Sequence, residues 1–416
     1  MDSLRRIDPE IAAAIDTEAA RQANTIELIA SENHVSAPVL AALGTVLTDK
    51  YAEGYPHKRY YRGCENVDTV EQICIDRAKH LFGADHANVQ PHCGTSANMA
   101  VYLATLQPGD KIMGMQLDHG GHLSHGLSIN VSGRWFRSAH YGVTRETEQL
   151  DMDQVRDAVL KEKPDILICG ASSYPRTIDF EAFGQIGKEA GCPVLADIAH
   201  IAGLVVGGVH PNPTPHCDFV TTTNHKTLRG PRGGIILCKA QYADAIDQAV
   251  FPGLQGGPLA HVIAAKAVAF QEAMQPEFKW YASAIVANAK ALADAVSERG
   301  WRLVTGGTDN HLMLVDLRSR DEDLTGNLAS QWLAAAGIVT NKNVIPYDPR
   351  NAKEASGIRL GTPAVTTRGM RPDQMHTLAE WFDLVLTSNG DPEVINTVRA
   401  EVMEFAKQFP IPAQRE

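Results

Sequence analysis

The sequence predicts an α/β fold: a mostly parallel central sheet flanked by helices, with a smaller α+β domain at the C-terminal end. Two short β-rich runs, 165–170 and 193–200, flank a helical pattern at 180–190. This order gives parallel strands, because the chain crosses over the sheet between them. Hydrophobic residues make up 44% of the chain and charged residues 21%, a balance typical of a globular protein.

The length of the chain predicts more than one domain. A chain of 416 residues is too long for one ordinary core and long enough for two or three packed domains. A helical region at 259–299, interrupted near Pro276, links the two larger parts. We expect an N-terminal helix and active-site loop segment at 1–65, a large α/β domain at 66–275 and the smaller domain at 276–416.

Charge and cysteine content argue against several classes of protein. The 38 Lys+Arg against 49 Asp+Glu give a net charge of −11, and no basic run is present that could follow a phosphate backbone. No apolar run approaches the roughly 20 residues that span a bilayer, and the start of the chain lacks an apolar signal region. The 7 cysteines form no CxxC pair. We therefore expect a cytoplasmic protein without nucleic-acid or membrane partners, disulfides or structural zinc.

The N-terminal part contains one periodic stretch and one aromatic stretch. Aliphatic and charged residues alternate at helical spacing over 9–30, and Pro9 suits a first helical turn, so we predict a helix there. The stretch 51–63 is dense in aromatic and ionisable side chains and poor in aliphatic ones, so it cannot build a core. It forms either an exposed loop or a pocket wall, where desolvation would raise the pKa of Glu53 toward the range of an acid–base group.

Two glycine-containing stretches precede the predicted sheet. After a helix predicted at 67–82, a Gly-Thr-Ser turn at 94–96 opens another helix, and its free N–H groups and hydroxyls suit a phosphate, although a plain N-cap is the alternative. Three histidines lie at intervals of three in 119–125 beside paired glycines. Only Asp118 accompanies them as a further ligand, so we expect no metal and instead an imidazole stacked on a flat cofactor.

The predicted strand ends carry the residues that point to a cofactor. Asp197 and His200 end one strand, and Lys226 follows the next strand, predicted at 218–222. Ligands of parallel sheets collect at such ends. A carboxylate that keeps a pyridine nitrogen protonated and an amine that forms a Schiff base are what pyridoxal phosphate requires. Taken singly, the lysine reads as a solvated loop residue and the aspartate as a helix cap, so it is their combination with the phosphate turn that favours the cofactor.

Beyond Lys226 the sequence predicts strands at 235–237 and 311–316 and a flexible glycine-rich loop at 251–258. Arg359 lies between two glycines in 357–363. The planar fork of an arginine suits a substrate carboxylate, whereas a surface salt bridge is the alternative.

Nearly the whole chain resembles the serine hydroxymethyltransferase family of fold-type-I pyridoxal-phosphate enzymes. The matching blocks are spaced along the sequence at 28–33, 50–56, 119–123, 225–234, 255–258 and 308–311. The resemblance implies transfer of a one-carbon unit between a β-hydroxy amino acid and tetrahydrofolate, with serine and glycine as the expected pair. It also implies a homodimer with shared active sites and leaves open whether two dimers associate.

The resemblance assigns roles to individual positions. Lys226 would carry the cofactor, Asp197 would pair with its pyridine nitrogen and His122 would stack on its ring. The remaining cofactor contacts would come from Gly94, Thr95, Ser172, His200, His225 and, from a neighbouring subunit, Tyr51 and Gly257. The amino-acid carboxylate would be held by Arg359, Ser31 and Tyr61. Glu53 would handle protons near the hydroxymethyl group and folate, and the other folate contacts would be Leu117, Gly121, Leu123 and Asn343.

The chain departs from the pattern of that family at several positions. The departures are Cys93-Gly94-Thr95-Ser96 for Ser-Gly-Ser-Gln, Asn224 for threonine, His57 and Arg62 for two glycines, and Ala171 for a bulky aromatic residue. The small Ala171 would enlarge the amino-acid pocket, so conversion of 2-methylserine to D-alanine is an alternative reaction. A folate-independent aldolase and a non-catalytic scaffold are further alternatives. The folate-like positions weigh against the aldolase, and the presence of Lys226 and Arg359 weighs against the scaffold.

Overall fold

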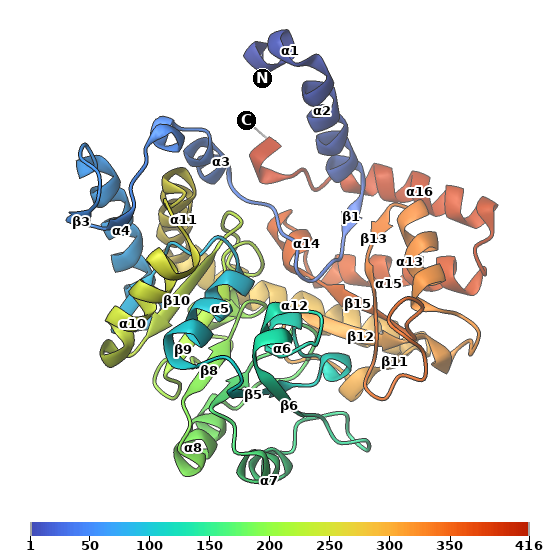
Figure 1. Ribbon diagram of the computed structural model, residues 1–416. Helices are drawn as coiled ribbons and strands as arrows, with labels where there is room; N and C mark the ends of the chain where they lie inside the picture. Colours follow the sequence, from blue (N-terminus) through green and yellow to red (C-terminus); the bar gives the residue numbers. More distant parts are fainter. Residues whose placement is uncertain (1, 415–416) are drawn as a thin grey trace.

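A computed structural model describes residues 2–414 and contains a seven-stranded sheet in the order β4-β10-β9-β8-β7-β5-β6. Its strands are β4 (His86–Asn88), β5 (Lys111–Met115), β6 (Arg137–Tyr141), β7 (Ile166–Cys169), β8 (Val194–Asp197), β9 (Phe219–Thr223) and β10 (Gly234–Cys238). The pairings among β5 to β9 are parallel, and β10 is antiparallel to both of its neighbours. The predicted α/β fold with a mostly parallel sheet is therefore confirmed (Figure 1).

Helices cover both faces of this sheet, which explains why its central strands are apolar without alternation. In β7, Leu167 and Cys169 belong to one hydrophobic cluster, whereas Ile166 and Ile168 belong to another. The first cluster includes residues of α4 (Glu65–Phe82), α7 (Met152–Glu162), α8 (Phe180–Ala190) and α11 (Ala260–Ala273). The second includes residues of α5 (Gly94–Thr105) and α10 (Ala243–Gln248). Helix α8 has the predicted bounds because Asp179 caps its start and Gly191, at φ 70°, ends it.

The C-terminal part contains a second, four-stranded antiparallel sheet in the order β11-β12-β15-β14. Its strands are β11 (Arg302–Leu303), β12 (Leu312–Asp316), β14 (Asn341–Asn343) and β15 (Gly357–Gly361). The helices that pack with it are α12 (Pro276–Glu298), α13 (Gly326–Ala335), α15 (Pro372–Thr387) and α16 (Pro392–Ala406). Helix α12 links the two cores, because Ile285 packs in the core of the large sheet and Leu292 in that of the small one.

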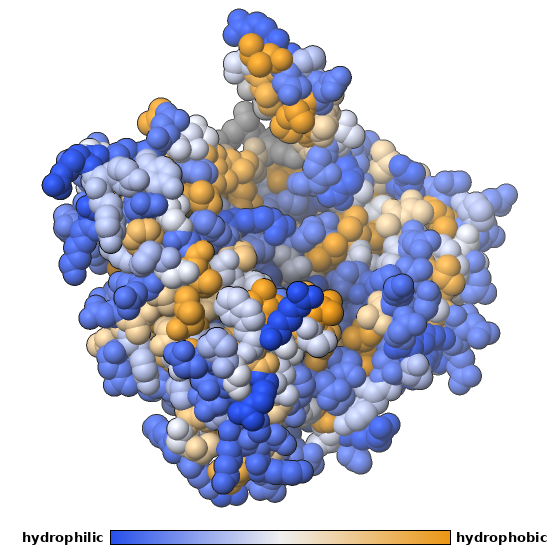
Figure 2. Space-filling model, viewed as in Figure 1, coloured by the Kyte–Doolittle hydropathy of each residue, from blue (hydrophilic) through white to orange (hydrophobic). Residues whose placement is uncertain are grey.

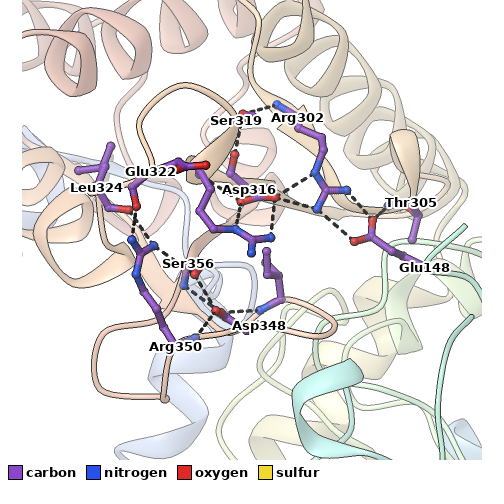
Figure 3. Close-up of polar contacts among 12 residues, drawn as sticks. Glu148, Arg302, Thr305, Asp316, Ser319, Glu322, Leu324, Asp348, Arg350 and Ser356 are labelled. Carbon is purple, nitrogen blue, oxygen red and sulfur yellow. Dashed lines mark hydrogen bonds and ion pairs between the residues drawn. The ribbon is translucent and has the colours of Figure 1, made fainter. Parts of the chain in front are cut away.

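A polar network joins the two sheets at one side of the molecule (Figure 3). Glu148, in the loop between β6 and α7, accepts hydrogen bonds from Arg302 at 2.9 Å and from the Thr305 N–H at 3.0 Å. The guanidinium of Arg302 also donates to Asp316 at 2.8 Å. These bonds hold the start of the small sheet against the large one.

Two predictions of local structure are wrong. The first helix does not reach residue 30: α2 (Pro9–Asn24) ends early, and the short strand β1 (Ile26–Glu27) pairs with β13 (Ile338–Val339). Burial of Ile26 in the C-terminal core overrides the helical pattern there. The predicted loop at 251–258 overlaps the end of a wide helical turn, Ala249–Leu254, in which Phe251 has a non-helical backbone, so it lies outside the turn only from 255.

The N-terminal segment divides between the two larger parts. Helices α1 (Asp2–Ile7) and α2 project from the body beside α16, and α3 (Ala37–Leu43) packs on α11 (Figure 1). The division into domains at 65 and 275 stays a prediction. Residues 1 and 415–416, which it includes, lie outside the described range. Within that range, no helix combines the length and the apolar character needed to cross a membrane.

Arg368 fastens the end of α2 to the C-terminal helix. Its buried guanidinium donates to the carbonyls of Thr25 at 2.6 Å and Ala23 at 3.1 Å, and to those of Ala406 at 2.9 Å and Phe409 at 2.6 Å. The last carbonyls of a helix have no partner within it, so this one side chain satisfies acceptors at the ends of both α2 and α16.

We expect Arg368→Met to lower the free energy of unfolding by about 2–4 kcal/mol, because several carbonyls lose their donor in a buried site. Urea unfolding followed by circular dichroism measures this change. Arg399→Met, which removes an exposed arginine from α16, is the matched control and should change stability by less than about 0.5 kcal/mol. Equal stability of the two variants would contradict this role of Arg368.

Candidate active site

One cavity of about 200 Å³ lies at the carboxyl ends of β8 and β9, and eight of the predicted cofactor residues line it. They are Gly94, Thr95, His122, Ser172, Asp197, His200, His225 and Lys226. Asp197 is the last residue of β8, and Lys226 follows β9 by three residues, as parallel neighbouring strands require. The structure therefore brings together side chains that are up to 132 positions apart, from 94 to 226.

Lys226 is almost completely buried in this cavity. Its side chain is among the buried polar groups, with 9% of the residue exposed. Burial lowers the pKa of Lys226 to about 8, although the nearby Asp197 carboxylate acts in the opposite direction. An amine with this pKa is partly unprotonated near neutral pH, and the unprotonated form is the nucleophile.

Asp197 is held as a carboxylate by three donors. Its Oδ2 accepts hydrogen bonds from Asn98 Nδ2 at 2.8 Å and from His125 Nε2 at 3.0 Å, and its Oδ1 accepts one from the Ala199 N–H at 3.1 Å. Burial by itself raises the pKa of Asp197, but the bond from His125 and the remaining contacts outweigh it and hold the pKa well below its usual range. The charge is thus fixed before any ligand enters.

Asn98, Ser124 and Thr221 are part of this arrangement, and the sequence reasoning missed them. Asn98 Nδ2 also donates to Ser124 Oγ at 2.9 Å, and Asn98 Oδ1 accepts from Thr221 Oγ1 at 2.5 Å. Ser124 Oγ is in turn 2.7 Å from His122 Nδ1, which fixes the ring that was predicted to stack on the cofactor. The spacing of Asn98 from Gly94 was an available signal, because residues four apart share one face of a helix.

His122, His125 and Asp197 also form a cluster whose ligand atoms lie within 4.8 Å of one another. Such a set could hold a metal ion, but His125 Nε2 and Asp197 Oδ2 are already joined to each other. Burial lowers the pKa of His122 to about 4, so its imidazole is neutral at physiological pH. The absence of a metal at this cluster stays a prediction.

The start of α5 forms the phosphate-sized end of the cavity. Its first N–H groups, on Gly94 and Thr95, have no partner within the helix, and both residues line the cavity together with His225. A Cβ at position 94 would lie 2.8 Å from Thr223 Cγ2, so only glycine allows this approach. Burial lowers the pKa of His225 to about 3, which leaves its imidazole uncharged.

Arg359 reaches the same region from the small sheet. It is buried in β15, and its guanidinium donates to the Ser172 carbonyl at 2.8 Å and to Asn341 Oδ1 at 3.1 Å. Burial lowers the pKa of Arg359 to about 10, yet the group stays charged at neutral pH. A buried cation of this shape suits a carboxylate ligand.

His311, like Arg359, belongs to the C-terminal part of the chain and lies at the site. The sequence reasoning did not predict it as a site residue. Its Nε2 lies 3.1 Å from His200 Nδ1, and the two rings stack with centroids 5.4 Å apart. Burial lowers the pKa of His311 to about 3, so the pair is neutral and one ring donates to the other. Its position in the matching block 308–311 was the signal available in the sequence.

The tyrosine-rich loop forms a separate cluster outside the cavity. The rings of Tyr51 and Tyr61 lie 5.3 Å apart, and a Cβ at Gly257 would lie 3.0 Å from Tyr51 Cε1. Glu53 lies beside this loop, and its charge raises the pKa of the exposed Tyr61. Ser31 is not among the residues that line the cavity, although Asn33, two residues later, donates to the Lys226 carbonyl at 2.8 Å. Within one chain, Tyr51, Glu53, Tyr61 and Gly257 are likewise not among the lining residues.

A second cavity of about 340 Å³ adjoins the first and shares His122 with it. Leu117 lines this cavity, whereas the other predicted folate positions, Gly121, Leu123 and Asn343, are not among its lining residues. Asp348 and Arg350 form its opposite wall, and the Asp348 carboxylate accepts from Ser356 Oγ at 2.6 Å, which orders the loop (Figure 3). The Asn343 side chain instead donates to the Val344 carbonyl at 2.6 Å.

Of the departures in sequence, Cys93, Thr95 and Ala171 line the cavity. Asn224 lies two residues before Lys226 and is not among the lining residues. Asn224 is fully buried, and neither atom of its amide has a hydrogen-bond partner among the described residues. Nothing in the described part of the chain explains the asparagine at this position.

Comparison with known proteins places this site in a family. The model of the serine hydroxymethyltransferase family matches residues 4–382. The chain is 56% identical over 411 residues to a serine hydroxymethyltransferase of Nostoc punctiforme, and 57% identical over 412 residues to one of a second Nostoc strain. Each match covers 99% of this chain and 96% of the relative. The chain therefore belongs to the serine hydroxymethyltransferase family.

Proposed function

We propose that this protein is a pyridoxal-phosphate-dependent hydroxymethyltransferase that interconverts serine and glycine and exchanges the one-carbon unit with tetrahydrofolate. The observation that carries the proposal is the buried Lys226, whose pKa is lowered to about 8, in one cavity with the ionised Asp197 and the start of α5. The names of the relatives, both serine hydroxymethyltransferases, agree with it.

The residues present fit the cofactor. Lys226 would hold its aldehyde carbon, Asp197 its pyridine nitrogen and the N–H groups of Gly94 and Thr95 its phosphate, while Gly94 leaves the space that any side chain would fill. When bound, pyridoxal phosphate withdraws electrons from the amino acid, so that negative charge at its α-carbon is tolerated. Asp197 supports this because its hydrogen bonds keep it ionised, and an ionised carboxylate holds a proton on the pyridine nitrogen.

The other residues bind and orient the substrates. Arg359 would hold the amino-acid carboxylate, with Ser31 and Tyr61 as further contacts, and His122 would cover one face of the ring. Ser172 and His200 lie in the cavity where the phenolic oxygen of the cofactor would lie. Tetrahydrofolate would enter the second cavity, past Leu117. Gly121, Leu123 and Asn343 would be its further contacts, and Glu53 would move a proton between it and the hydroxymethyl group.

We also propose a homodimer in the cytoplasm. The arm formed by α1 and α2 projects from the body and carries Ile7, Ile11 and Ile15, all exposed, with Ile7 at 82% (Figure 2). An apolar projection of this kind is stabilised when a second surface covers it. A dimer would also carry the loop with Tyr51, Glu53 and Gly257 into the partner's cavity. All 7 cysteines are free, which suits a reducing compartment.

The alternative reactions are not favoured. Both relatives are named for serine, which argues against 2-methylserine as the preferred substrate and against a folate-independent aldolase. Lys226, Asp197 and Arg359 are buried at the site, and a scaffold would have no need to keep these charges there.

The activity is tested by turnover with matched substrates. With pyridoxal phosphate and tetrahydrofolate, L-serine should give glycine, 2-methyl-L-serine should react more slowly, and omission of tetrahydrofolate should abolish steady transfer. Lys226→Ala should lower kcat by at least about 1,000-fold, because no other amine lies at the cavity to replace it. Preferred turnover of 2-methyl-L-serine, or equal turnover without tetrahydrofolate, would contradict the proposal.

Asn98→Ala tests the support of Asp197. We expect kcat to fall about 10- to 100-fold, because one charge-assisted hydrogen bond to the carboxylate is lost and Ser124 loses its donor. Asn288→Ala is the matched control, since Asn288 is also a buried asparagine bonded to a threonine, Thr366, but lies in α12. Steady-state kinetics and urea unfolding distinguish an effect on catalysis from an effect on stability. Both variants should be less stable, and only Asn98→Ala should have a lower kcat.

The pKa of Lys226 predicts how the cofactor-free protein reacts with an aldehyde. Because only the unprotonated amine reacts, the rate of reductive methylation of Lys226 by formaldehyde should rise with pH and reach half its maximum near pH 8. Ordinary exposed lysines, with a pKa of about 10.4, should need a pH more than two units higher. Peptide mass spectrometry follows each lysine, and a midpoint for Lys226 near pH 10 would refute the lowered pKa.

A further inference from the structure

Lys266 is a fully buried cation that the proposed reaction does not use. It lies in α11 with 1% of its surface exposed. Its ammonium donates to the carbonyls of Val89 at 2.7 Å, Gly234 at 2.9 Å and Pro91 at 3.1 Å, and no ion pair joins it to a carboxylate within the described range. A buried charge is costly, and burial lowers the pKa of Lys266 to about 8, although the charge of Glu71 acts in the opposite direction. The group is still mostly protonated at neutral pH, held by the three carbonyls, and its presence calls for a function.

The three carbonyls lie directly behind the phosphate end of the cavity. Val89 and Pro91 belong to the segment that leads from β4 into α5, and Gly234 starts β10. The Gly234 N–H donates to the Pro91 carbonyl at 3.0 Å, so Lys266 and Gly234 hold the same acceptor. This arrangement fixes the segment that ends in the first turn of α5.

The packing of Gly234 connects this arrangement to the N–H groups that face the cavity. A Cβ at Gly234 would lie 2.6 Å from the Cys93 carbonyl oxygen and 3.2 Å from Gly94 N. A Cβ at the neighbouring Gly233 would lie 3.0 Å from Lys266 Nζ. The ammonium, the two glycines and the Cys93–Gly94 peptide are therefore packed in direct succession, with no room for a side chain between them.

The other basic side chains near this turn are either uncharged or screened by water, so Lys266 can supply the positive charge there. His225, the side chain at the phosphate end, is uncharged because burial lowers its pKa. Arg232 is exposed and lies 3.4 Å from His225 Nε2, so water screens its charge. A charge inside the protein acts over a longer distance than one in water, and a cation behind a helix N-terminus adds to the positive potential there.

We propose that Lys266 is a positioning residue for the phosphate of the bound cofactor: it anchors the turn whose N–H groups receive the phosphate and adds a buried positive charge behind them. The proposal rests on the proposed function, because that function assigns a phosphate to this end of the cavity. It predicts that Lys266 matters for ligands that carry a phosphate and not for the same ligands without it.

The test compares binding of pyridoxine 5′-phosphate and pyridoxine to the cofactor-free full-length chain by calorimetry. Neither ligand has an aldehyde, so Lys226 cannot bind it covalently and activity is not the readout. Lys266→Met should weaken pyridoxine 5′-phosphate binding about 10- to 100-fold and leave pyridoxine binding within about twofold. Lys279→Met, which removes an exposed lysine of α12, is the matched control and should change neither affinity.

Two results would overturn the proposal: an unchanged preference of Lys266→Met for the phosphorylated ligand, or an equal loss of affinity for both ligands. Failure of the proposed function would look different, because the unmodified protein would then show no preference for the phosphorylated ligand. Lys266→Gln keeps N–H donors without charge and should show a smaller loss that is again specific to the phosphate.

A measurement on the unmodified chain covers the case in which these variants do not fold. The 15N resonance of Lys266 Nζ should shift on addition of pyridoxine 5′-phosphate and not on addition of pyridoxine. Identical spectra with both ligands would overturn the proposal.

Discussion

The ionised carboxylate of Asp197 is the constraint on which the rest of the site depends. A charge buried at the end of β8 persists only where donors replace the water it has lost. Asn98 supplies one donor from α5 and His125 another from the short turn after β5. Each donor is itself held by a further group: Thr221 Oγ1 donates to Asn98 Oδ1, and the His122 N–H donates to His125 Nδ1. The requirement of one carboxylate therefore fixes the relative positions of two strands, one helix and one turn.

The carboxylate of Asp197 also acts on Lys226, the lysine of the same cavity. Burial lowers the pKa of Lys226, whereas Asp197 raises it, and the result near 8 is a lysine that is enclosed and yet able to react. Arg359 comes from the other sheet and bonds the Ser172 carbonyl across the boundary. The geometry of the site therefore depends on the relative position of the two sheets. The bonds of Glu148 to Arg302 and to Thr305 hold them together at one side.

Features of the fold and the site that depend on local sequence pattern could be predicted from the sequence, whereas features that depend on contacts between distant residues could not. The alternation of strands and helices and the ends of β8 and β9 follow from local pattern, so Asp197 and Lys226 could be placed in one cavity from the sequence. Ser124 and Thr221 could not, because their role depends on contacts across the sheet and their residue types are common in turns and strands. The early end of α2 was missed for a related reason. Ile26 leaves the helical pattern to pair beside Ile338, a partner more than 300 positions away in the chain.

The division of the predicted site into two clusters connects catalysis to assembly. Around Lys226, one chain provides eight of the proposed cofactor residues, and Arg359 is the group that we propose for the amino-acid carboxylate. Tyr51, Glu53, Tyr61 and Gly257 gather instead in a loop cluster of their own, where Tyr51 and Tyr61 are exposed. If each cavity is completed by the loop of a second copy, Glu53, for which we propose a role in proton transfer, reaches the cavity only when two chains associate. The apolar arm of α1 and α2 would then serve the reaction indirectly, because covering it stabilises the association that completes the site.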